Sequence, residues 1–242
     1  MSSGAATEGT RPDERPRQTG PPGRPWSGGG REELAASVRR LMELTVTSAP
    51  PPGVLAETAA MVDAAADLLE FAVPDDSEPV PRFNGYDVAL EERTGLTDSM
   101  PFDMVAGQCN PLAPPIEIWF DPPLARGRAV FSPTYEGAPG WVHGAALAAA
   151  FDIILTAANV LADAAGPTVE LTIHYRRPTL IGVESLFESQ VTEVTDRRTH
   201  SRGVLMQNGK VTVEAVGQFV NIDRDKIAAL HRMRTRHDEA AD

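Results

Sequence analysis

Residues 140–152 read Gly-Trp-Val-His-Gly-Ala-Ala-Leu-Ala-Ala-Ala-Phe-Asp and are the most informative stretch of this 242-residue chain. Small side chains fill the segment, so a sheet or another backbone can come close to it. The segment extends to residue 162 with a length and a composition that are typical of a helix. A helix this apolar has to be covered by other parts of the protein. We therefore expect one long central helix over residues 142–162.

Strand-like segments lie on both sides of that helix in the sequence. Two precede it, and four follow it: 116–120, 127–135, 169–176, 183–194, 198–207 and 211–222. Asn208-Gly209 is a hairpin-type turn before the last segment. Strands joined by tight turns imply an antiparallel sheet. The sequence thus predicts an α+β fold in which an antiparallel sheet wraps one long helix.

The rest of the chain divides by composition. Residues 1–30 are rich in Gly, Pro, Ser and charge, which predicts a disordered tail. Apolar residues at helical spacing predict a helical hairpin over 31–46 and 54–71, interrupted by a proline-rich break. We expect a tail at 1–30, a helical extension with an irregular linker at 31–107, the main domain at 108–223, and a C-terminal helix and tail at 224–242.

Composition limits the function. A formal net charge of −12 argues against nucleic acid as a partner. No run of 18 residues is apolar without a charged residue in it, so we expect no transmembrane segment. The N-terminus has no apolar signal region, so we do not expect secretion. One cysteine, Cys109, fits a reducing, cytoplasmic location. The five histidines lack metal-ligand spacing, so we expect no metal and no cofactor. A catalytic Cys109 paired with a histidine is an alternative that nothing near it in sequence supports.

Asp152 is the candidate catalytic group, because a lone carboxylate among apolar residues costs free energy unless it is paired or used. Gly144, near the helix start, leaves a backbone N–H available to stabilise an oxyanion. An alternative is that Asp152 belongs to a solvated polar face, since Thr156, Asn159 and Asp163 follow it at helical spacing. The small residues on the N-terminal side of Asp152 favour a buried edge or an interface instead.

Helix geometry adds a condition. Nine residues separate His143 from Asp152, which is roughly 13 Å at a rise of about 1.5 Å per residue. One scissile carbonyl cannot contact both ends of that distance in one chain. If the two groups act together, the sequence predicts a homodimer in which the Gly144 amide faces the partner's Asp152.

The run Tyr-Glu-Gly-Ala-Pro-Gly-Trp-Val-His-Gly at 135–144, then Asp152 and Tyr-Arg-Arg-Pro at 175–178, resembles the PaaI-type hotdog-fold acyl-CoA thioesterases. The resemblance covers about residues 108–222. It is strongest to the thioesterase-superfamily-member branch, which hydrolyses long-chain acyl-CoA in fatty acid metabolism. It implies a hotdog fold, a curved antiparallel sheet around the central helix, and homodimers that often pair again into tetramers.

The resemblance also implies roles for residues. Asp152 would be the general base or nucleophile, Gly144 N–H would polarise the thioester carbonyl, and Thr168 would orient the water or the carboxylate. We expect His143, Ala145, Arg176 and Arg177 to contact the substrate, and arginine suits phosphate groups. His143 is also expected to bond backbone at the helix start. Where the family has His-Gly-Gly, this chain has Ala145 in the last position.

Strand parity conflicts with the role of Thr168. By alternation, Thr168 lies on the same side as Glu170, opposite a core side formed by Val169 and Leu171. Thr168 could then contribute only if its side of the strand faces the partner subunit.

The resulting hypothesis is hydrolysis of acyl-CoA to a free acid and CoA, and a thiolate leaves readily, so a base and an oxyanion site suffice. Base and nucleophile roles for Asp152 both stay open. One alternative is a non-catalytic acyl-CoA-binding hotdog protein. Another is a hotdog enoyl-CoA hydratase, which would pair the Asp with a His five residues on, where this chain has Ala157.

Overall fold

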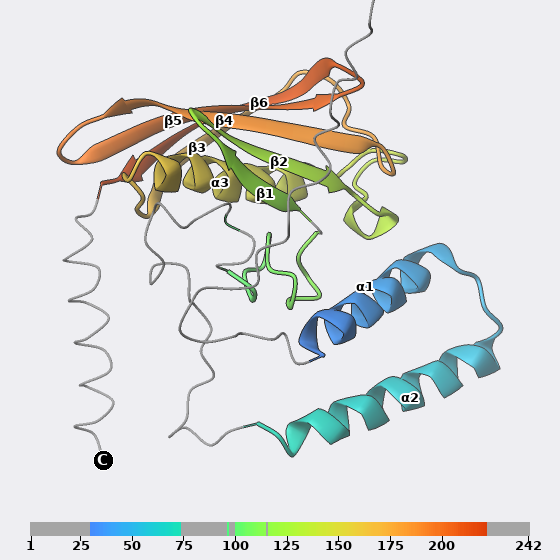
Figure 1. The fold of residues 1–242 in the computed structure, drawn as a ribbon. Coiled ribbons are helices and arrows are strands. Elements are labelled where there is room, and N and C mark those ends of the chain that lie inside the picture. The colour runs from blue at the N-terminus through green and yellow to red at the C-terminus, as the bar shows by residue number, and fades with distance from the viewer. Residues whose placement is uncertain (1–29, 74–95, 97–99, 115, 222–242) are drawn as a thin grey trace, which may run out of the picture.

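The computed structural model describes residues 30–73, 96, 100–114 and 116–221. A six-stranded antiparallel sheet, in the order β1-β2-β4-β5-β6-β3, curves over one long helix (Figure 1). The strands are β1 (Glu117–Asp121), β2 (Leu124–Val130), β3 (Thr168–Tyr175), β4 (Glu184–Val194), β5 (Arg198–Gln207) and β6 (Lys210–Val220). This is the predicted hotdog architecture.

The central helix α3 (Gly144–Leu161) packs on the inner face of the sheet. Glycines in the strands let it approach: a Cβ on Gly127 would lie 2.5 Å from Ile154 Cδ1, and one on Gly217 would lie 2.9 Å from Leu155 Cδ1. By length and composition α3 could cross a membrane, but 56% of it is buried inside the protein. Its apolar side chains therefore belong to the core of the domain.

The N-terminal extension contains the predicted pair of helices, α1 (Arg31–Thr47) and α2 (Pro52–Glu70). Helix α1 packs against the short 3-10 helix η3 (Pro133–Tyr135), whereas α2 lies farther from the sheet (Figure 1). Arg39 of α1 donates hydrogen bonds to the carbonyls of Gln108 (3.3 Å) and Asn110 (3.0 Å). These bonds fasten α1 to the segment that precedes the sheet.

Most predicted elements agree with the structure to within a few residues. The predicted strand over 127–135 is wrong at both ends, because β2 begins at Leu124 and stops at Val130. Pro133 favours the 3-10 turn, and the Ser132 side chain accepts a hydrogen bond from Thr134 N–H at its start. Residues 1–29 of the predicted tail, and the predicted C-terminal helix and tail at 224–242, lie outside the described residues.

Candidate active site

The N-terminus of α3 holds one free amide. His143 is the N-cap, and its Nδ1 accepts a hydrogen bond from Ala145 N–H at 3.0 Å. The His143 carbonyl accepts from the N–H groups of Ala146 and Leu147. Within the described part of the chain, Gly144 N–H has no acceptor. The first turn of the helix therefore offers the Gly144 amide to a ligand, which is what an oxyanion site requires.

A tight loop fixes this helix start. His143 N–H donates to the Tyr135 carbonyl at 2.8 Å, and a Cβ on Gly137 would come within 2.9 Å of His143 Cα. Gly137 therefore has no room for a side chain. The backbone of residues 135–143 folds back on itself and determines where α3 begins.

Tyr175 is a site residue to which the sequence assigned no role. Its hydroxyl donates to the Gly144 carbonyl at 2.8 Å. A Cβ on Gly144 would lie 3.1 Å from Tyr175 Oη, so this contact favours glycine at position 144. The Tyr-Arg-Arg-Pro motif contained the residue, but only the folded chain brings the strand to the helix start.

Asp152 is half-buried on the side of α3 that the sheet leaves uncovered. Thr168, the first residue of β3, donates its hydroxyl hydrogen to Asp152 Oδ1 at 2.6 Å. A short hydrogen bond to a carboxylate is stronger than one between neutral groups. It fixes one carboxylate oxygen and leaves the other for a water or a substrate.

A β-bulge explains how Thr168 reaches Asp152. Thr168 is paired with Phe219 and Glu170 with Gln218, so Val169 is an extra residue in β3. Directly paired residues point to the same side of a sheet, and Phe219 is fully buried in the core. Thr168 therefore faces α3 of its own chain. The expectation that it faces away from the core is wrong, and so is the assignment of Val169, 48% exposed, to the core side.

The polar stripe on α3 is not a solvated face. Asn159 is fully buried, and its Oδ1 accepts a hydrogen bond from Ser201 of β5. Thr156 is half-buried and donates back to the Asp152 carbonyl at 2.8 Å. Of the three residues that follow Asp152 in the stripe, only Asp163, beyond the end of the helix, is exposed.

The two arginines that were predicted to contact the substrate donate hydrogen bonds to other groups of the protein. Arg176 donates through two nitrogens to Glu214 Oε2, at 2.9 and 2.8 Å, and Arg177 donates to the Val211 carbonyl at 2.7 Å. No hydrogen bond in the described structure connects either side chain to Asp152 or Gly144. Ala145 is exposed beside the free amide. Substrate contacts by these residues remain predictions.

Other chemistries find little support in the described residues. No group of three or more His, Cys, Asp or Glu side chains among them is placed to hold a metal ion. Burial raises the pKa of the Cys109 thiol to about 11. A thiol with so high a pKa is a poor nucleophile near neutral pH, so Cys109 is not activated.

The comparisons with known proteins concern the family and the fold. Residues 139–214 match the family model of the thioesterase superfamily. A solved structure described as a thioesterase superfamily protein is 25% identical and covers 78% of this chain and 90% of its own, with a TM-score of 0.69. Zebrafish thioesterase superfamily member 2 is 21% identical and covers 44% of this chain and 81% of its own, with a TM-score of 0.41. A mutant of the phenylacetic acid degradation protein PaaI from Thermus thermophilus is 18% identical and covers 44% of this chain and 93% of its own, with a TM-score of 0.41. No curated protein matches the sequence.

The match to the first of these structures extends beyond the sheet and α3. The sheet with α3, residues 116–221, makes up less than half of the chain, whereas this match covers 78% of it. The family match and this structure confirm the resemblance found in the sequence.

Proposed function

We propose that this chain, whose residues 139–214 match the family model of the thioesterase superfamily, hydrolyses acyl-CoA thioesters to a free acid and CoA. The observation that carries the proposal is the 2.6 Å hydrogen bond from Thr168 to Asp152. It holds a carboxylate in a fixed orientation on a helix whose first turn presents a free amide. A positioned carboxylate and an oxyanion donor are what hydrolysis of a thioester needs.

In the proposed reaction, Asp152 accepts a proton from a water molecule as its oxygen attacks the thioester carbonyl. The negative charge that develops on the carbonyl oxygen is stabilised by Gly144 N–H. The carbon–sulfur bond then breaks, the acid is released, and the CoA thiolate takes up a proton. Alternatively the carboxylate attacks directly, forming an anhydride that water cleaves. Solvent oxygen-18 found in the Asp152 carboxylate after a single turnover would identify direct attack.

We propose that the active unit is a homodimer. Asp152 and Gly144 are eight residues apart on one straight helix, about 12 Å, which is too far for one carbonyl to contact both. The less buried side of α3 and the edge strand β3, which pairs only with β6 in the described sheet, are both open to contact with a second copy, and this supports the proposal. Each site would then combine a Gly144 amide with the partner's Asp152.

We also propose a cytoplasmic location, on the basis of the single cysteine.

The test is thiol release from acyl-CoA by the wild type and by Asp152→Asn. We expect Asp152→Asn to lower kcat by about 10²–10⁴-fold, the range for loss of a general base. Asp163→Asn is a matched control, since it makes the same change just beyond the end of the helix, at an exposed position. Equal turnover by wild type and Asp152→Asn would show that the site is wrongly assigned.

The two other candidate functions give different results in the same assay. An acyl-CoA-binding protein without activity would bind the thioester and release no thiol in the wild type. A hydratase would add water to an enoyl-CoA and leave the thioester intact. The position that a hydratase would fill with histidine is Ala157, which is fully buried, so hydrolysis is the better supported of the two reactions.

A further inference from the structure

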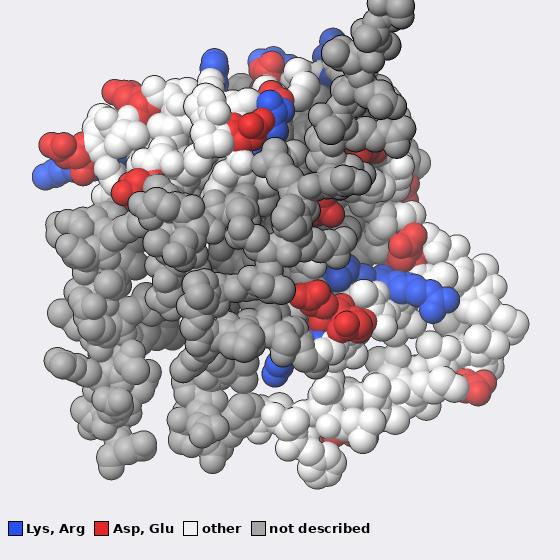
Figure 2. All heavy atoms as spheres, in the orientation of Figure 1, with Lys and Arg blue, Asp and Glu red and all other residues white. Residues whose placement is uncertain are grey.

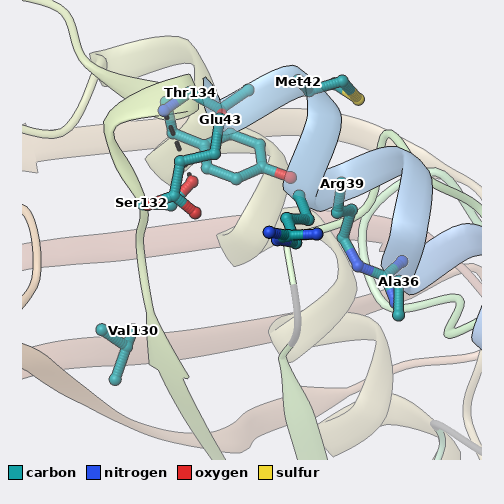
Figure 3. A pocket seen from close by; sticks show the side chains of 9 residues that line it. Ala36, Arg39, Met42, Glu43, Val130, Ser132 and Thr134 are labelled. Atoms are coloured by element: carbon teal, nitrogen blue, oxygen red, sulfur yellow. Dashed lines mark hydrogen bonds between the residues drawn. The ribbon is translucent and has the colours of Figure 1, made fainter. Parts of the chain in front are cut away.

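A cavity of about 250 Å³ lies between α1 and the segment that joins β2 to η3 (Figure 3). It is lined by Ala36, Arg39, Arg40, Met42, Glu43, Val130, Ser132, Thr134 and Tyr135. Glu43, Ser132 and Thr134 gather at one end, and Ala36 and Arg39 lie at the other. The cavity thus has an end with a carboxylate and hydroxyls, and an end with arginine.

Neither arginine at this cavity forms an ion pair with a carboxylate of the described residues. Arg39 donates only to the backbone carbonyls of Gln108 and Asn110, which accept hydrogen bonds without supplying a charge. Arg40 is exposed, and no hydrogen bond or ion pair joins it to any described residue. Basic groups lie over α1 with acidic groups beside them (Figure 2). In a chain of net charge −12, two arginines that line one cavity and form no ion pair with a described carboxylate suit an anionic ligand, above all a phosphate.

The cavity is structurally joined to the candidate active site. The Tyr135 side chain lines the cavity, and its hydroxyl donates to the Leu112 carbonyl at 2.9 Å. The Tyr135 carbonyl accepts the 2.8 Å hydrogen bond from His143 N–H, and His143 immediately precedes Gly144. One residue therefore connects the cavity wall to the helix start. A long ligand whose reacting end lies at Gly144 would have its remote end near α1.

We propose that Arg40, assisted by Arg39, binds a phosphate group of CoA in this cavity. This proposal rests on the proposed function, because the acyl group would lie at Gly144 while the pantetheine arm leads toward α1. The N-terminal helix then has a role in specificity: it favours thioesters of CoA over thioesters that carry no nucleotide. Glu43, at the opposite end, opposes binding of the phosphates by like-charge repulsion.

Titration calorimetry with the full chain tests this, using CoA and pantetheine, which carries no phosphate. Neither compound is a thioester, so binding is measured without turnover. We expect Arg40→Ala to weaken CoA binding about tenfold, the usual loss for a charge-assisted hydrogen bond, and to leave pantetheine binding unchanged. Arg197→Ala, in the turn between β4 and β5, is the matched control and should leave both unchanged. Glu43→Gln should tighten CoA binding severalfold.

Two results would overturn the proposal: equal CoA affinities for Arg40→Ala and Arg197→Ala, or equal affinities of the wild type for CoA and pantetheine. Arg40 is the primary variant because Arg39 also holds the segment around Gln108 in place. The thiol-release assay separates the two proposals. If the protein hydrolyses acyl-CoA but Arg40→Ala does not change CoA binding, only the assignment of the cavity is wrong. If the protein binds CoA more tightly than pantetheine but does not hydrolyse acyl-CoA, only the proposed catalytic function is wrong.

Discussion

Helices α3 and α2 are almost the same length and both are rich in apolar residues, but their surroundings differ completely. Helix α3 has 18 residues, of which ten are buried. Helix α2 has 19 residues and none is buried, although it carries leucines, valine and methionine. The apolar pattern predicted both helices, and it did not distinguish a helix that the sheet covers from one that the chain itself leaves uncovered.

The largest effect should follow from a change in the covered helix. Phe151 is fully buried and meets Phe187 of β4 edge-to-face, with ring centroids 5.5 Å apart. Phe151→Ala should lower the free energy of unfolding by about 3–5 kcal/mol, measured by urea denaturation, because it leaves a cavity and removes a ring contact. A loss below about 1 kcal/mol would mean that α3 is not the centre of the core.

Cys109 reports whether α1 stays docked, because Arg39 bonds the residues on either side of it. With its pKa raised from 9.0 to about 11 by burial, the thiol at pH 8 should react with iodoacetamide about a hundredfold more slowly than an exposed cysteine. The rate should rise as the pH approaches 11, because more thiolate forms. A fast reaction at pH 8 in native buffer would show that the segment and α1 separate in solution.

Thr168→Val tests the uncovered side of α3. The substitution keeps the shape of the side chain and removes the hydrogen bond to Asp152. We expect kcat for thiol release to fall about tenfold, which corresponds to about 1.4 kcal/mol of transition-state stabilisation. Thr172→Val on the same strand is the control, since the Thr172 hydroxyl donates only at 3.4 Å, to Glu170. Similar losses in both variants would argue against a positioning role for Thr168.

The smallest effect should come from α2. Leu68 is 77% exposed, so Leu68→Ala should change the free energy of unfolding by less than about 0.5 kcal/mol. Denaturation at two protein concentrations checks this. A loss above about 2 kcal/mol that grows with concentration would show that another copy of the chain covers α2, and the contrast with α3 would then disappear.

Much of the architecture was predictable because it depends on local patterns. Alternation along 198–207 matches β5 residue for residue, and the apolar run after residue 142 gave α3 to within two residues at each end. The boundary of β2 was not predictable from alternation, because Pro133 and the Ser132 side chain end the strand through local turn chemistry. The burial of Asn159 was also missed, since its partner Ser201 lies 42 residues away in sequence.

The sequence by itself determined the order of the elements, the position of the carboxylate on the helix and the glycine at its start, because each depends on neighbours within a few residues. Only the tertiary structure decided which groups meet. One extra residue, Val169, reverses the side on which Thr168 projects and brings its hydroxyl to Asp152. A bulge arises from the pairing of β3 with β6, whose partners are some 50 residues apart, and the side-chain alternation of a single strand contains no trace of it.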